Sequence, residues 1–122
     1  MSFELTITKY PDWWHATVEG QNTPANVSTY MRELFEACVE GNCSKLLIEE
    51  RLDGPRLGTI DVFDIASKRA DDMRGVQMPI AYVDMNAAGD LMAFAEMVAK
   101  NHGSMVKVFT TLAEAEALLS RL

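Results

Sequence analysis

Residues 45–67 read KLLIEERLDGPRLGTIDVFDIAS and divide into an apolar run, a charged stretch with several turn residues, and an amphipathic segment. The apolar run, residues 46–48, is too continuous to leave one face to solvent, which predicts a strand at the centre of a sheet. Two glycines and a proline within residues 54–58 predict a loop. Thr59 precedes apolar residues at helical spacing, so we expect its hydroxyl to cap a helix. A strand, a loop and a helix in this order form the repeating unit of an α/β fold.

The flanking sequence continues this alternation of strands and helices. Apolar and polar residues alternate over residues 3–8 and 14–18 on either side of a turn, which predicts an antiparallel hairpin. Helical spacing then predicts a helix that is capped by Thr23 and ends at Gly41 in the left-handed conformation. The remaining predicted elements are a helix at 59–73, a strand at 79–83, a helix ending at 101–103, a strand at 106–109, and a last helix whose capping box pairs Thr111 with Glu114.

This order predicts a single α/β domain over residues 1–122. Its mixed five-stranded sheet would begin with the antiparallel hairpin and continue in parallel βα units joined by right-handed crossovers, in the order ββαβαβαβα. The chain contains neither a linker nor a low-complexity segment that would divide it.

Charge and composition exclude several classes of function. A net charge of −7 argues against a nucleic-acid-binding protein, which needs a positive surface. No apolar run is long enough to cross a bilayer, and the first residues do not resemble a secretion signal. We therefore expect a soluble cytoplasmic protein without stable membrane insertion. Cys38 and Cys43 lack the spacing of a zinc site, so we expect free thiols, no metal and no cofactor.

The order of elements, together with the segments KLLIEER, GTIDVFDIA and VFTTLAEAEALL, resembles the STAS domain of anti-sigma-factor antagonists and the broader STAS-like group of small bacterial proteins. The resemblance implies a non-enzymatic partner switch, in which a kinase phosphorylates a serine at the start of the helix after the central strand. This chain has a longer loop without a serine, and its nearest hydroxyl belongs to Thr59. Thr59 is therefore the candidate phosphoacceptor, with plain helix capping as the alternative.

Polar side chains gather where the predicted parallel strands end, which is where open α/β sheets bind ligands. The candidate loop and ligand site consists of Glu50, Arg51, Asp53, Arg56, Thr59 and Asp84, with Asn86 following the last of these. Its carboxylates suit a hard cation or acid–base chemistry, and its arginines suit an anion. The alternative is that the same groups cap helices and face water, since no metal-binding or phosphate-binding motif is present.

Two aromatic residues are candidates for an interface. Trp13 and Trp14 point to opposite faces of a strand, which would leave one of them partly exposed, and Phe63 lies on the second predicted helix. The leading hypothesis is a non-catalytic regulatory module of STAS-like type that binds a protein partner or a second copy of itself.

Two further hypotheses make different structural predictions. A domain that binds a small apolar or lipid-like ligand would hold a cavity behind methionine and aromatic side chains. A carboxylate- or metal-dependent hydrolase would bring Glu50, Asp53 and Asp84 into one cleft.

Overall fold

A computed structural model describes residues 3–84 and 89–122 and places five strands in one mixed sheet. Asn86, which the sequence places after Asp84, lies outside the described residues. The strands lie side by side in chain order, with β1 and β2 antiparallel and all later neighbours parallel. Their bounds are Phe3–Lys9 for β1, Trp14–Gln21 for β2, Leu46–Asp53 for β3, Pro79–Asp84 for β4 and Met105–Phe109 for β5. The predicted fold class and order of elements are confirmed.

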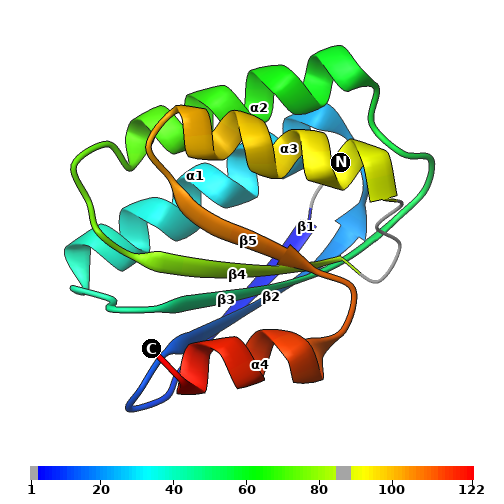
Figure 1. Ribbon diagram of the computed structural model, residues 1–122. Coiled ribbons are helices and arrows are strands. Elements are labelled where there is room, and N and C mark those ends of the chain that lie inside the picture. The colour runs from blue at the N-terminus through cyan, green and yellow to red at the C-terminus, as the bar shows by residue number, and fades with distance from the viewer. Residues whose placement is uncertain (1–2, 85–88) are drawn as a thin grey trace.

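Helices cover the two faces of the sheet unequally (Figure 1). The helices α1 (Pro24–Glu40), α2 (Thr59–Asp72) and α3 (Gly89–Asn101) lie on one face, and α4 (Leu112–Ser120) lies on the other. Because successive residues of a strand point to opposite faces, the core divides into two clusters. The larger cluster packs beneath the three helices, and the smaller one joins Leu47, Ala81 and Val83 to the apolar side of α4.

The central strand is longer than the sequence predicted. β3 continues through Asp53, so residues 49–53 belong to the sheet and not to a flexible loop. The strand extends because β2 pairs with it over its whole length, and β4 pairs with it as far as Glu50. The loop that follows is anchored, since Asn22 donates its backbone N–H to Asp53 O at 2.7 Å and its side-chain amide to Pro55 O at 3.1 Å.

Thr59 does not cap α2, contrary to the prediction. Gly58 is the N-cap residue, with extended dihedral angles, and no side chain makes the capping hydrogen bond there. Thr59 is the first helical residue and is exposed. The other two predicted caps are confirmed: the hydroxyl oxygens of Thr23 and Thr111 accept from backbone N–H groups three residues along.

Gly41 was also predicted wrongly as a left-handed helix end. Its φ is −91°, and the left-handed residue is Asn42, with φ of 54°. Glycine is required for a different reason, because a Cβ at position 41 would lie 2.3 Å from Cη2 of Trp14. The ammonium group of Lys9 lies over the Trp14 ring, 4.5 Å from the ring centroid. Gly75 and Gly103, which follow α2 and α3, do adopt positive φ.

Candidate functional site

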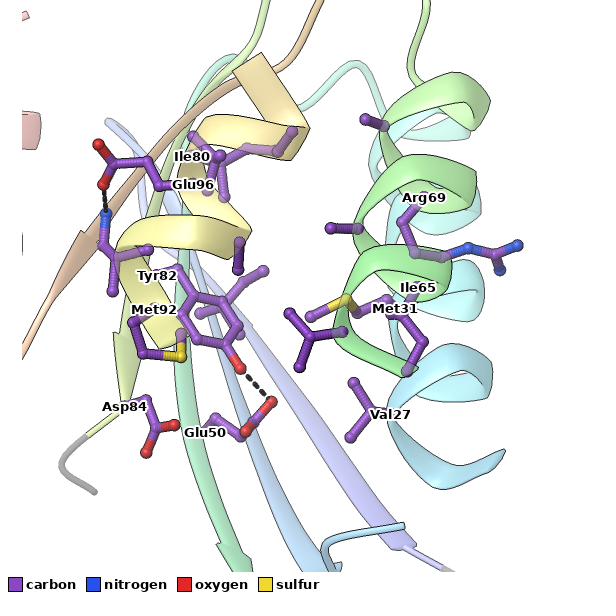
Figure 2. A pocket seen from close by; sticks show the side chains of 18 of the residues that line it. Val27, Met31, Glu50, Ile65, Arg69, Ile80, Tyr82, Asp84, Met92 and Glu96 are labelled. Carbon is purple, nitrogen blue, oxygen red and sulfur yellow. Dashed lines mark hydrogen bonds between the residues drawn. The ribbon is translucent and has the colours of Figure 1, made fainter. Parts of the chain in front are cut away.

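A pocket of about 130 Å³ lies between the sheet and the helices α1, α2 and α3 (Figure 2). Its floor is formed by residues of β3, β4 and β5 such as Ile48, Ile80 and Val108. Its walls include Met31 from α1 and Ile65 from α2. Most of the lining is apolar, so the pocket favours an apolar guest over water.

Small side chains in the covering helices leave this space open. Ala66 and Ala70 in α2, and Ala95 and Ala99 in α3, all line the pocket. Each pair is four residues apart and therefore lies on one face of its helix. The two helices contact each other beside the pocket, where Phe63 and Phe94 stack with ring centroids 6.4 Å apart. The helices thus meet each other while presenting only methyl groups at these four positions to the sheet.

A buried carboxyl group stands at one end of the pocket. Glu50 is only 7% exposed and points into the pocket from β3 (Figure 2). Its Oε2 accepts hydrogen bonds from the hydroxyls of Tyr30 on α1 and Tyr82 on β4. Among the described residues, none donates to its other oxygen, Oε1. The cluster therefore presents one unoccupied oxygen of a buried carboxyl group.

Burial shifts the pKa values of all three groups in this cluster. Loss of water raises the pKa of Glu50, and the neighbouring Asp84 raises it further, whereas the two tyrosine hydroxyls lower it without reversing the shift. Burial and the adjacent Glu50 hold the pKa values of Tyr30 and Tyr82 well above the ordinary tyrosine value. Both tyrosines therefore remain protonated throughout the physiological pH range, and both donate their hydroxyl protons to Glu50.

The opposite face of β3 carries a second buried carboxylate. Glu49 is 4% exposed; its Oε1 lies 2.9 Å from Nε2 of His15, and its Oε2 accepts from Arg51 at 2.7 Å. Burial alone would raise the pKa of Glu49, but the hydrogen bonds from Arg51 and His15 outweigh it and lower the pKa. Both oxygens are occupied, which makes Glu49 a structural ion pair on the α4 side of the sheet.

The residues of the site predicted from the sequence do not lie together. Some line the pocket, one lies on the opposite face of the sheet, and others are exposed to solvent. Glu50, Asp84 and Arg56 line the pocket. Arg51 belongs to the Glu49 pair on the other face, and Asp53 is exposed and is not among the lining residues.

The three remaining predicted residues do not line the pocket. Thr59 is exposed at the start of α2, and its side chain makes no capping bond. Phe63 is 46% exposed on the same helix. Trp13 is half-buried against the α4 cluster, and its Nε1 is buried without a hydrogen-bond partner among the described residues.

Sequence reasoning missed the two tyrosines that define the polar end of the pocket. The sequence places Tyr30 in the helix predicted after Thr23 and Tyr82 in the strand predicted at 79–83, with no polar role for either. A signal was present, because a tyrosine at a core position needs a partner for its hydroxyl and a glutamate in a central strand needs donors. The two tyrosines lie 20 and 32 residues from Glu50 in the sequence. A single sequence does not reveal that residues so far apart form hydrogen bonds with each other.

No protein-family model matches this chain, and no curated protein shows significant similarity to it. Within residues 3–84 and 89–122, the His, Cys, Asp and Glu side chains form no group of three or more that could hold a metal ion. Over the same part of the chain, every helix is too short or too polar to cross a membrane. Cys38 and Cys43 are both free, the first of them buried in the core.

Proposed function

We propose that this protein is a non-catalytic binding domain for a small amphipathic molecule, which it holds between the sheet and the helices α2 and α3. The observation that carries the proposal is the apolar pocket that ends at the Glu50 carboxyl group. Ligand pockets combine an apolar lining with a few placed polar groups that orient the guest. The methionines Met31 and Met92 and the ring of Tyr82 line this space, and a lining of methionine and aromatic side chains supports the ligand-binding proposal.

The size of the pocket limits the ligand. Its volume of about 130 Å³ is similar to that of the engineered protein cavity of about 150 Å³ that binds a single benzene molecule. The enclosed part of the guest is therefore a single ring or a short branched chain. A long acyl chain would extend beyond the pocket or require α2 and α3 to separate from the sheet.

Two measurements test this proposal. Native mass spectrometry of the freshly isolated protein should show a co-purified small molecule. NMR titration with benzyl alcohol, a neutral ring-sized probe, should shift the signals of pocket residues such as Ile65, Ile80 and Val108. Shifts spread evenly over the surface, together with an adduct-free mass spectrum, would contradict the proposal.

A pair of variants on α2 provides the control. Ala66→Phe places a ring in the pocket and should abolish the benzyl alcohol shifts. Lys68→Phe introduces the same ring at an exposed position of the same helix and should leave the shifts intact. Circular dichroism of both variants establishes that they are folded.

A second candidate is the regulatory module suggested by the STAS-like resemblance. The observation in its favour is an exposed apolar surface on α2, where Ile60 is 78% exposed and Phe63 is 46% exposed. Such a surface suits contact with a protein partner, and a second copy of the chain is the partner to test first. Sedimentation velocity over a range of concentrations should show association that Ile60→Lys abolishes. A monomer at all concentrations would remove self-association from this candidate.

Phosphorylation of Thr59 belongs to the same candidate. Thr59 is exposed at the positive end of α2 and its hydroxyl is not used as a cap, so a phosphate there would be accessible and favourably placed. The intact mass after incubation with extracts of the source cell, compared with that of Thr59→Val, tests this modification.

A further inference from the structure

We propose that the ligand carries a protonated amine, which binds Oε1 of Glu50 as a cation while the ligand's apolar part fills the pocket. This inference rests on the proposed binding function and specifies the chemical class of the ligand. It follows from which hydrogen-bonding groups at the polar end of the pocket are already occupied and which are not.

The two hydroxyl groups at this end of the pocket already donate hydrogen bonds within the protein. Tyr30 and Tyr82 both direct their hydroxyl protons to Oε2 of Glu50. Two hydrogen bonds to one oxygen stabilise the ionised carboxylate, and they leave Oε1 as the oxygen that is still available to a donor. Because Glu50 is only 7% exposed, its ionised form has little of the water that would normally stabilise it. A cation at Oε1 would replace the stabilisation of the negative charge that the excluded water would otherwise provide.

The charges around Glu50 favour a cation over an anion. Asp84 is the register partner of Glu50 on the adjacent strand, and its charge acts on Glu50 in the same direction as burial. On α3, the Glu96 carboxylate is occupied by Val108 N and Lys100. The surroundings of Glu50 on the strands and on α3 are therefore acidic or already paired.

Neither arginine of the lining forms an ion pair with Glu50. Arg69 on α2 is paired with Asp72 at 3.2 Å and donates to Ser28 O, and its guanidinium points away from the pocket (Figure 2). Arg56 is exposed in the loop before α2 and forms no ion pair with Glu50. An anionic head group at Oε1 would therefore approach the buried carboxyl group of Glu50, whose surroundings Asp84 already makes more negative and with which no arginine of the lining is paired.

Benzylamine, benzyl alcohol and benzoate test the inference, because they share one ring and differ in charge. NMR titration at pH 8 should give a dissociation constant for benzylamine at least tenfold lower than that for benzyl alcohol, with no binding of benzoate in the pocket. Glu50→Gln should weaken benzylamine binding at least tenfold and change benzyl alcohol binding less than twofold. The glutamine side chain of this variant keeps an oxygen that accepts from both tyrosines, so the pocket is preserved.

A control variant and the pH dependence distinguish the local effect of the Glu50 charge from the effect of the protein's net charge. Glu33→Gln makes the same change of net charge at an exposed position of α1 and should leave benzylamine binding unchanged. Benzylamine binding should weaken as the pH falls and Glu50 takes up a proton, and calorimetry in buffers of different ionisation enthalpy should detect proton release on binding.

The possible outcomes distinguish the inference from the proposed function. Equal affinity for benzylamine and benzyl alcohol, or preference for benzoate, would overturn the amine inference and leave the binding pocket standing. Failure of all three probes to bind would overturn the inference and would also count against the pocket as a binding site for ring-sized molecules.

Discussion

Glu50 couples the stability of the fold to pH in the direction opposite to most acidic side chains. Its pKa is raised in the folded state, so the folded protein binds this proton more tightly than the unfolded chain does. The stability contributed by protonated Glu50 is complete below the ordinary glutamate pKa of about 4.3 and is lost as the pH rises through the raised value. Each tenfold difference in proton affinity corresponds to about 1.4 kcal/mol.

Glu50→Gln should remove this loss, because the amide that replaces the carboxyl group does not titrate. Urea unfolding of both proteins between acid and neutral pH should show the variant gaining stability relative to the natural chain as the pH rises above about 4.3. Glu49→Gln is the matched control, because the pKa of Glu49 is lowered. That variant should be less stable at neutral pH by about 1–2 kcal/mol, and the deficit should shrink as the pH falls. Parallel stability curves for Glu50→Gln and the natural chain would contradict the raised pKa.

Gly41 illustrates a residue that is required for space and not for a special backbone angle. A Cβ at this position would lie 2.3 Å from the Trp14 ring, which packs against the larger core cluster. Gly41→Ala should therefore displace the ring and lower the free energy of unfolding by about 1–3 kcal/mol, measured by urea unfolding with tryptophan fluorescence. Glu40→Ala is the control, because it adds an alanine at the exposed position next to Gly41, at the end of the same helix. Equal stability of the two variants would show that Trp14 moves aside freely.

At the scale of elements, the fold could be predicted from the sequence because its signals are local. Alternation over the hairpin strands and helical spacing after Thr23 and Thr111 depend on neighbouring residues only. The boundary of β3 could not be predicted, because it depends on β2 pairing with it as far as Gln21↔Asp53. For the same reason Glu50 was expected in a solvated loop, whereas its burial depends on partners from α1 and β4.

The attachment of α4 depends on a contact that spans most of the chain. Lys45, just before β3, donates from Nζ to Leu119 O at 3.0 Å and to Leu122 O at 2.8 Å. A cation at the carboxyl end of a helix satisfies free carbonyl groups and interacts favourably with the helix dipole. The side chain therefore joins the last helix to the centre of the sheet.

Lys45→Met should loosen α4 while leaving the sheet intact. We expect a loss of about 1 kcal/mol in the free energy of unfolding and faster amide hydrogen exchange in α4 than in the natural chain. Lys68→Met, at an exposed position of α2, should change neither quantity. Unchanged exchange rates in α4 of the Lys45 variant would show that the apolar contacts of Ala115 and Leu119 hold the helix without the lysine.

At the scale of the whole molecule, the two faces of the sheet differ in how completely they are filled. The α4 face is closed by a small cluster in which Ala81, Ala115 and Leu119 are fully buried. The other face retains a pocket of about 130 Å³ under α2 and α3. Unfilled apolar space weakens packing, so the three-helix side keeps room for a ligand and forgoes some stability.

The same substitution on the two faces should therefore have opposite effects. Ala95→Leu places additional carbon atoms in the pocket and should raise the free energy of unfolding by about 1 kcal/mol while abolishing the binding of ring-sized probes. Ala81→Leu forces the same atoms into the filled cluster beneath α4 and should lower the free energy of unfolding by about 1–3 kcal/mol. Urea unfolding measures both effects, and a ligand that binds the folded state should add stability to the natural chain but not to Ala95→Leu. Destabilisation of similar size on both faces would mean that α3 already packs closely on the sheet in solution, and the pocket would then be too small to hold a ligand.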